Sequence, residues 1–213
     1  DLCCPPYDII STEEQKMFYD KSLYNVIRLE FGMGEDRYSD AKRYLKEWID
    51  CGVLKTDDAE GIYVYEEEFS LPDGSKRVTR GFIARIFLTP FSDGMVLPHE
   101  ETLSKAKEDR FKLMEATNCN FSQIYSLYND EQKKITKILE KYSKTVPVEE
   151  FTIGDGVIHR LWVINNPDDI ACIVSEMSDK KVFIADGQQR YETAVNYKNH
   201  LIELGKIKGD END

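Results

Sequence analysis

The sequence predicts a mixed fold, α/β to α+β, in which hairpins of a mixed β-sheet are packed by helices. Two segments have the pattern of a β-hairpin, several others have the 3.6-residue periodicity of amphipathic helices, and the two kinds are interleaved rather than strictly alternating. The 213 residues, 41% of them hydrophobic and 11% aromatic, are enough to bury a core. We therefore expect a single α/β domain over 1–213, or one domain with a subordinate lobe.

The first fifty residues predict two helices and a strand. Ser11 followed by Glu14 is a capping-box pattern, which predicts a short helix over 12–19. Residues 24–31 alternate at period two, as in a strand. From 38 to 49 apolar residues recur at steps of three and four, and Gly52 stands where a C-terminal cap is expected.

The middle of the chain begins with the clearest hairpin. Its first strand runs from 62 to 69, the turn covers 71–75, and the return strand covers 78–88 before Pro90. We then expect a helix over 103–116, a strand over 121–128 and a helix over 130–142. The last elements expected are a hairpin of 146–153 with 157–164 around a Gly-Asp-Gly turn, a helix over 167–177, a strand over 181–185 and a helix over 188–204.

Charge and composition exclude several classes of protein. With 28 Lys and Arg against 40 Asp and Glu, the net charge is −12, which argues against a partner that offers a phosphate backbone. No stretch approaches the length of a membrane span. Five scattered cysteines form no disulfide framework, which indicates the reducing cytoplasm. The chain begins without Met, and we expect it to be a fragment of a longer protein. Its oligomeric state is unknown.

Several common motifs are missing. Gly32-Met33-Gly34 lacks the third glycine of the dinucleotide fingerprint, and there is no Walker loop or Gly-x-Ser-x-Gly elbow. The three histidines make no local metal cluster, so the metal, if any, is unknown.

The strongest candidate site is the joint formed by residues 183–192. A buried strand ends at Asp186 and Gly187, and a helix with Arg190 in its first turn begins with Gln188 and Gln189. Gly187 lets the backbone approach an oxyanion, the helix N-terminus favours negative charge, and Arg190 can grip two oxygens. Asp186 can hold magnesium or accept a proton. A structural Asp-Gly turn with a salt-bridged arginine is the alternative, given equal weight from the pattern alone.

A second candidate is the segment 97–110, a loop with His99 and Glu100 that runs into a cationic helix. Lys107 and Arg110 lie on one face of that helix and Lys105 on another. Such a cluster can hold an anionic metabolite or nucleotide phosphates, and a solvated face with ion pairs is at least as common. Histidine as a residue type can exchange a proton near neutral pH, and His99 lies in a loop, so it is a candidate acid or base.

These segments together resemble a bacterial family, domain of unknown function 1015, over essentially the whole chain. The matching stretches are Pro5-Pro6-Tyr7-Asp8, Leu71-Pro72-Asp73-Gly74, Leu97-Pro98-His99-Glu100, Asp109-Arg110, Asn120-Phe121-Ser122, His159-Arg160-Leu161-Trp162 and Ile184-Ala185-Asp186-Gly187 with Arg190-Tyr191-Glu192. The family has no firmly established activity. Its Asp-Gly-x-x-Arg joint is in turn similar to that of the ParB and sulfiredoxin superfamily, which binds phosphates there and includes free-serine kinases; likeness of fold does not fix function.

The resemblance implies two competing functions. One is a small-molecule phosphotransferase that uses ATP or ADP with Mg²⁺, in which Asp186, His99 and Glu100 are catalytic and Gly187, Gln188, Gln189, Arg190, Lys105, Lys107 and Arg110 bind the nucleotide. The other is a non-catalytic sensor of a nucleotide or phosphometabolite. The family has two histidines where this chain has Gln188 and Gln189, and Gln cannot exchange a proton near pH 7. That departure favours the sensor for this chain.

Overall fold

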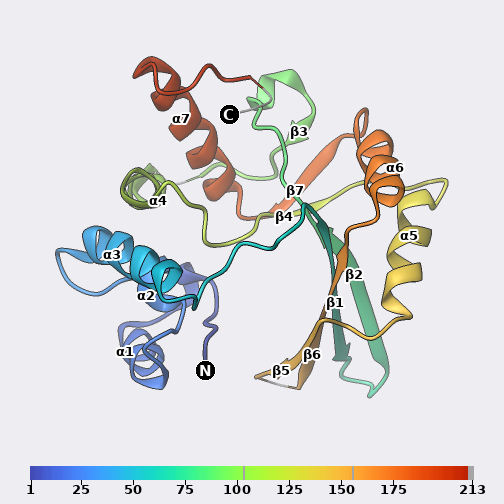
Figure 1. Cartoon of the computed structure of the whole chain (residues 1–213), viewed down its shortest axis with the longest axis horizontal. Helices are drawn as coiled ribbons and strands as arrows, with labels where there is room; N and C mark the ends of the chain where they lie inside the picture. The colour runs from blue at the N-terminus through green and yellow to red at the C-terminus, as the bar shows by residue number, and fades with distance from the viewer. Residues whose placement is uncertain (103, 155, 211–213) are drawn as a thin grey trace. The chain divides into compact units, whose positions relative to one another are not determined.

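The computed structural model describes residues 1–102, 104–154 and 156–210 (Figure 1). In this part of the chain seven α-helices accompany two β-sheets, so the fold is mixed α/β as predicted. The contacts divide the chain into two compact units, each built from separated segments. Unit 1 contains Asp1–Thr56, Leu88–Ser126 and Phe183–Asp213, and unit 2 contains Asp57–Phe87 and Leu127–Val182. No helix of the described residues is both long and apolar enough to cross a membrane.

Unit 2 is a four-stranded antiparallel sheet with two helices on one face. The strand order is β2 (Lys76–Ile83), β1 (Ile62–Ser70), β6 (Val157–Ile164) and β5 (Glu149–Ile153). Helices α5 (Lys134–Ser143) and α6 (Pro167–Met177) bury their apolar stripes against β1 and β6. The core they form consists of Ile62, Val64, Ile135, Leu139, Trp162, Ile164 and Ile173. Both predicted hairpins and both helices are therefore confirmed, with shifts at their ends.

Unit 1 combines five helices with a small sheet. Its N-terminal helices are α1 (Thr12–Lys21), α2 (Ile27–Glu30) and α3 (Arg37–Asp50), followed by α4 (Ser104–Thr117) and α7 (Gln188–Glu203). The three-stranded sheet has the order β3 (Val96–Leu97), β7 (Val182–Asp186) and β4 (Tyr125–Leu127). Two short 3₁₀ turns, Tyr7–Ile9 and Phe91–Asp93, complete the elements. Helices α4 and α7 pack together through Met114, Ala194 and Tyr197.

The strand predicted over 24–31 is wrong, because those residues enclose the helix α2. Asn25 is fully buried, and its side-chain oxygen accepts a hydrogen bond from the Ile27 amide at 2.9 Å. Its side-chain nitrogen donates to the carbonyls of Asp1 and Cys3. Asparagine in this position starts a helical turn, so the local side-chain bond overrides the period-two alternation.

Other element boundaries also differ from the predicted ones, and the largest differences are in β2, β4 and α5. β2 ends at Ile83 instead of 88, because Leu88 packs in unit 1 beside Val96 and Met114. β4 covers only Tyr125–Leu127 of the predicted 121–128. α5 begins at Lys134 instead of 130, since the Asp130 carboxylate accepts hydrogen bonds from backbone amides of the first turn. The capping box of Ser11 and Glu14 is confirmed, with bonds of 3.2 and 2.8 Å.

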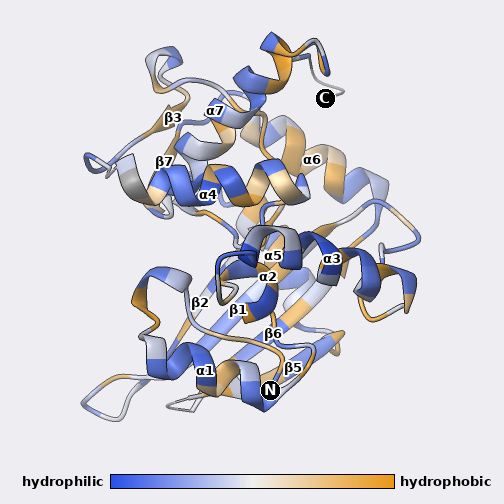
Figure 2. Ribbon diagram, turned by 90° about the vertical axis from the view of Figure 1, so that its left-hand side faces the viewer, coloured by the Kyte–Doolittle hydropathy of each residue, from blue (hydrophilic) through white to orange (hydrophobic). Residues whose placement is uncertain are grey.

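Helix α4 of unit 1 and helix α6 of unit 2 differ in the hydropathy of their residues. Figure 2 shows α4 mostly in the hydrophilic colour and α6 mostly in the hydrophobic colour. Because α4 packs on α7, some of its polar residues contact that helix, and the others face solvent. The candidate site is built from these polar residues.

Candidate anion-binding site

The predicted joint between strand and helix is present. β7 ends at Asp186, Gly187 has the left-handed backbone conformation with φ +81°, and α7 begins at Gln188. Burial of Ile184 with Tyr191 holds the strand and the helix together on either side of the turn. Among the described residues no side chain caps α7, so amides of its first turn remain available to a ligand.

Arg190 lies directly on this turn. A Cβ atom added to Gly187 would stand 2.8 Å from the Arg190 Cζ, so the missing side chain makes room for the guanidinium. Arg190 donates to the Asp186 carboxylate at 2.7 Å and to the Gln123 carbonyl at 2.5 Å. The Arg190 side chain is 14% exposed and that of Asp186 is 65% exposed. An exposed carboxylate holds its partner weakly, so an incoming anion can replace it.

Gln188 fastens the loop that carries His99 and Glu100 to the start of α7. Its side-chain oxygen accepts from the amides of His99 at 2.8 Å and Glu100 at 3.1 Å, and its nitrogen donates to the Glu100 carbonyl at 2.7 Å. Gln188 is 2% exposed. The side-chain amide of Gln188 is thus hydrogen-bonded to the loop backbone. The loop residues His99 and Glu100 are themselves exposed. Gln189 is half-buried in the same turn.

Glu192, one turn further along α7, binds α4 and the same loop. It accepts from Lys107 at 2.7 Å, Thr102 at 2.8 Å and Gln188 at 2.8 Å. Burial raises the pKa of Glu192, but these hydrogen bonds outweigh burial, and the net shift of the pKa is downward. The charge of Lys107 is therefore neutralised within unit 1.

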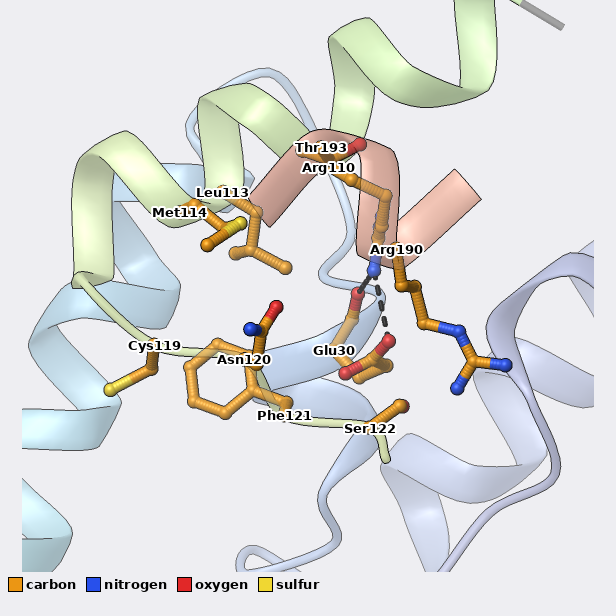
Figure 3. A pocket seen from close by; sticks show the side chains of 10 residues that line it. All are labelled: Glu30, Arg110, Leu113, Met114, Cys119, Asn120, Phe121, Ser122, Arg190 and Thr193. Atoms are coloured by element: carbon orange, nitrogen blue, oxygen red, sulfur yellow. Dashed lines mark hydrogen bonds and ion pairs between the residues drawn. The ribbon is translucent and has the colours of Figure 1, made fainter. Parts of the chain in front are cut away.

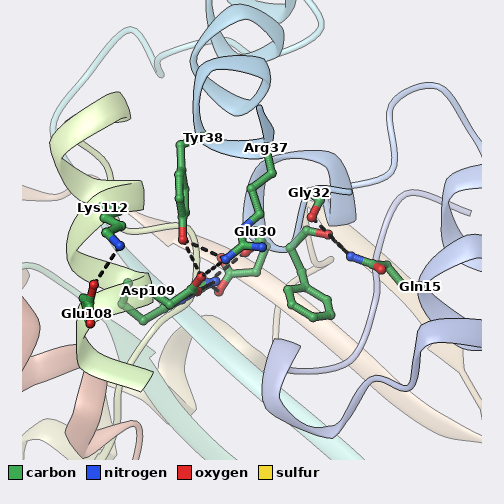
Figure 4. Close-up of polar contacts among 10 residues, drawn as sticks. Gln15, Glu30, Gly32, Arg37, Tyr38, Glu108, Asp109 and Lys112 are labelled. Atoms are coloured by element: carbon green, nitrogen blue, oxygen red, sulfur yellow. Dashed lines mark hydrogen bonds and ion pairs between the residues drawn. The ribbon is translucent and has the colours of Figure 1, made fainter. Parts of the chain in front are cut away.

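Arg110 is a buried structural residue of the α4 helix. Its side chain is 7% exposed, and it pairs with Glu30 at 3.0 Å and with Asp109 at 2.5 Å. It also donates to the Glu30 carbonyl at 2.8 Å. Figure 4 shows Glu30 and Asp109 beside Arg37 and Tyr38, which both bind the Asp109 carboxylate. Each of the three guanidinium nitrogens of Arg110 thus donates to a residue of α2 or α4.

The Tyr7 ring covers the other side of the same guanidinium. The Arg110 Cζ lies 3.7 Å from the centroid of the Tyr7 ring, within the range of a cation–π contact. Burial raises the pKa of the Tyr7 phenol, and the positive charges of Arg110 and Arg190 oppose that shift. The Pro-Pro-Tyr-Asp loop is therefore a neighbour of both arginines.

A small pocket lies between α4 and the start of α7 (Figure 3). Figure 3 shows Arg190 at one side of it and Leu113 with Met114 at the other. Asn120 and Ser122 also line it, whereas Asn118 ends α4 in the left-handed conformation and accepts a hydrogen bond from Tyr197. Of the polar residues after α4, two are thus available to a ligand and one caps the helix.

The structure brings the two predicted clusters together in unit 1. Gln188 and Glu192 join the segment 97–110 to the segment 183–192, and Arg110 and Arg190 line one pocket. The Lys105 side chain lies outside the described residues. Lys107 and Arg110 form ion pairs with Glu192 and Glu30, which are 20% and 6% exposed. The partner of Arg190 is Asp186, which is more exposed, at 65%.

Two residues of this arrangement, Glu30 and Tyr7, were not identified as site residues from the sequence. Glu30 lies in the segment predicted as a strand, and its partner Arg110 is 80 residues away along the chain. Tyr7 belongs to the Pro-Pro-Tyr-Asp stretch, which from the sequence marked only the resemblance to the family. Nothing local to either residue reveals these partners, because both contacts depend on tertiary packing.

The fold and site define an α/β protein whose polar residues converge on a strand–glycine–helix turn. A family model described as "Protein of unknown function (DUF1015)" matches residues 1–212, and the chain belongs to that family. No curated protein and no solved structure matched it. The likeness of the joint to the ParB and sulfiredoxin superfamily stays a prediction.

Proposed function

We propose that the protein binds a phosphorylated metabolite or a nucleotide through one phosphate group at the Gly187 turn. The observation that carries the proposal is the placement of the Arg190 guanidinium over Gly187 at the uncapped start of α7. A phosphate there receives hydrogen bonds from first-turn amides and a charge-assisted bond from Arg190.

The neighbouring charges favour a small ligand bound by a single cation. Lys107 pairs with Glu192 at 2.7 Å, and Arg110 pairs with Glu30 at 3.0 Å. If either cation turned to a ligand, its carboxylate partner would be left without that ion pair inside unit 1. Breaking a buried pair by withdrawing one partner is costly. Asn120 and Ser122 line one pocket with Arg190 and are neutral, so they can add polar contacts to such a ligand without adding charge.

Calorimetric titration with ATP, ADP and inorganic pyrophosphate tests the proposal. We expect Arg190→Ala to weaken binding at least about tenfold, the loss of roughly one charged hydrogen bond. Arg77→Ala, which removes an exposed arginine from unit 2, is the matched control and should bind as the wild type does. Equal affinities for wild type and Arg190→Ala would refute the proposal.

Phosphoryl transfer is the second candidate, and the exposed carboxylate of Asp186 beside Arg190 favours it. Asp186, at 65% exposure, can hold Mg²⁺ together with a nucleotide phosphate, or accept a proton from a hydroxyl. Among the described residues no group of three or more His, Cys, Asp or Glu could hold a metal ion, so the metal would arrive with the nucleotide. His99 and Glu100 present side chains to solvent from a loop whose backbone Gln188 holds in place.

Release of ADP from ATP in the presence of serine and other small hydroxyl compounds distinguishes transfer from binding alone. A transferase should lose this activity in Asp186→Asn while retaining part of its nucleotide affinity. If only a variant with Gln188→His and Gln189→His is active, the chain is a degenerate enzyme that now acts as a sensor. Inactivity of both proteins, with binding intact, supports the sensor.

A further inference from the structure

The strand β5 forms one edge of the sheet of unit 2, and its outer side pairs with no other strand of the described residues. All five of its residues are exposed. Phe151 and Ile153 are 41% and 45% exposed, and Val148 just before the strand is 57% exposed. An exposed apolar edge strand is a template for pairing with a further strand.

The two edges of this sheet are unlike. The outer strand β2 carries three exposed cations in its first five residues, Lys76, Arg77 and Arg80. Lys76 pairs with Glu68 at 2.8 Å and Arg80 with Glu66 at 2.7 Å, so Arg77 is the cation that hinders pairing with another strand. β5 has no cation, and one of its two carboxylates, Glu150, is neutralised by Arg160 at 2.6 Å. The edge at β2 therefore carries the positive charge of Arg77, whereas the edge at β5 carries the carboxylate of Glu149 and the exposed apolar side chains of Phe151 and Ile153.

The side chains of β5 are already ordered. The Phe151 ring stacks on His159 of β6 with centroids 5.2 Å apart and planes 15° from parallel. His159 in turn is hydrogen-bonded to the Tyr65 hydroxyl at 2.6 Å. A strand fixed in this way loses little further conformational freedom when it pairs.

The sequence of β5 is complementary to itself in one antiparallel register. Pairing centred on Phe151 uses all five residues, with Phe151 opposite Phe151, Glu149 opposite Ile153, and Glu150 opposite Thr152. No carboxylate then faces another, and the central aromatic pair stabilises the contact. A register centred on Glu150 would instead set two carboxylates opposite each other.

We propose that β5 pairs in this register with β5 of a second copy of the chain, joining two four-stranded sheets across a two-fold axis. The contact is small, so the dimer forms reversibly and depends on concentration. This inference is independent of the anion site, since every residue that carries it lies in unit 2.

Sedimentation velocity over a range of concentrations tests the dimer. We expect a monomer–dimer equilibrium for the wild type, weakened at least about tenfold by Phe151→Lys, because charge on an edge strand opposes pairing. Val78→Lys, on the edge at β2 and 50% exposed in the wild type, should dimerise as the wild type does. Ile153→Lys leaves the ring stack intact and should also weaken the dimer, so the result does not depend on the stability of Phe151→Lys.

Cysteine cross-linking tests the register. In Phe151→Cys the new thiols of the two copies stand opposite each other and should form an intermolecular disulfide, which mass spectrometry of the linked peptide identifies. Ile153→Cys faces Glu149 and should give no such link. A wild type that stays monomeric, a dimer that resists both lysine substitutions, or equal cross-linking at 151 and 153 would overturn the proposal.

Discussion

Gly187 is the residue on which the geometry of the candidate site depends most. Its positive φ allows β7 to turn directly into α7, and its missing Cβ admits the Arg190 guanidinium to the turn. One glycine therefore meets a conformational and a spatial requirement at once. The described cations of the site, Lys107, Arg110 and Arg190, each already have a carboxylate or carbonyl partner.

Replacing Gly187 with alanine should separate these two requirements. Gly74, in the turn between β1 and β2, has a nearly identical φ of +80°, but nothing lies within 4 Å of a Cβ added there. Gly74→Ala should cost only the left-handed backbone penalty, about 1–2 kcal/mol in urea unfolding. We expect Gly187→Ala to cost more than Gly74→Ala and also to weaken phosphate binding. Equal costs, with binding unchanged, would show that Arg190 need not lie on this turn.

At the scale of the elements, the site is held by contacts between α4, α7 and the loop of His99 and Glu100. Gln188 fixes the loop backbone, and Glu192 ties that loop and α4 to α7. These bonds span between 85 and 90 residues along the chain. The packing of Met114 on Ala194 and Tyr197 brings the two helices close enough for them to form.

The joint between α4 and α7 should weaken in acid through Glu192. Because the folded-state pKa of this carboxyl is lowered, its stabilising contribution is complete above the ordinary value of 4.5 and is lost as pH falls through the folded-state pKa. We expect the free energy of unfolding of Glu192→Gln to vary less with pH in this acidic range than that of the wild type. Glu60→Gln, at an exposed loop position, should keep the wild-type pH dependence. Parallel pH profiles for Glu192→Gln and wild type would contradict this role.

At the scale of the whole molecule, the chain makes two compact units with separate cores. The core of unit 2 shares no residue with the two apolar clusters of unit 1. Both units are discontinuous in sequence, since the chain passes between them at residues 56, 87, 126 and 182. All residues of the candidate anion site belong to unit 1, whereas the proposed dimer edge belongs to unit 2.

A cavity in the core of unit 2 should act mainly on that unit. Ile135 is fully buried in α5, and Ile135→Ala should destabilise unit 2 by about 2–5 kcal/mol. Native-state hydrogen exchange should then show faster exchange of amides in β1 and β6, with smaller changes in α7. Lys137→Ala, on the same helix, is the surface control. Equal acceleration in α7 would show that the two cores open together.

The sequence by itself determined most of the local structure. Capping at Ser11, the glycine turns and the apolar periodicities act through neighbours in the chain, so helices such as α3, α6 and α7 were predictable. The strand–Gly187–helix joint was predictable for the same reason. The segment 24–31 was mispredicted because a buried Asn25, bonded to residues more than twenty positions away, decides its conformation.

Only the tertiary structure decided which of the candidate charges remain available to a ligand. From the sequence, Lys107, Arg110 and Arg190 were all candidate ligands of an anion in an acidic chain. Folding buries Arg110 against Glu30 and Tyr7, pairs Lys107 with Glu192, and leaves Arg190 with an exposed partner. The strength of an ion pair depends on burial and on partners distant in sequence, and neither is encoded in the local pattern of residues.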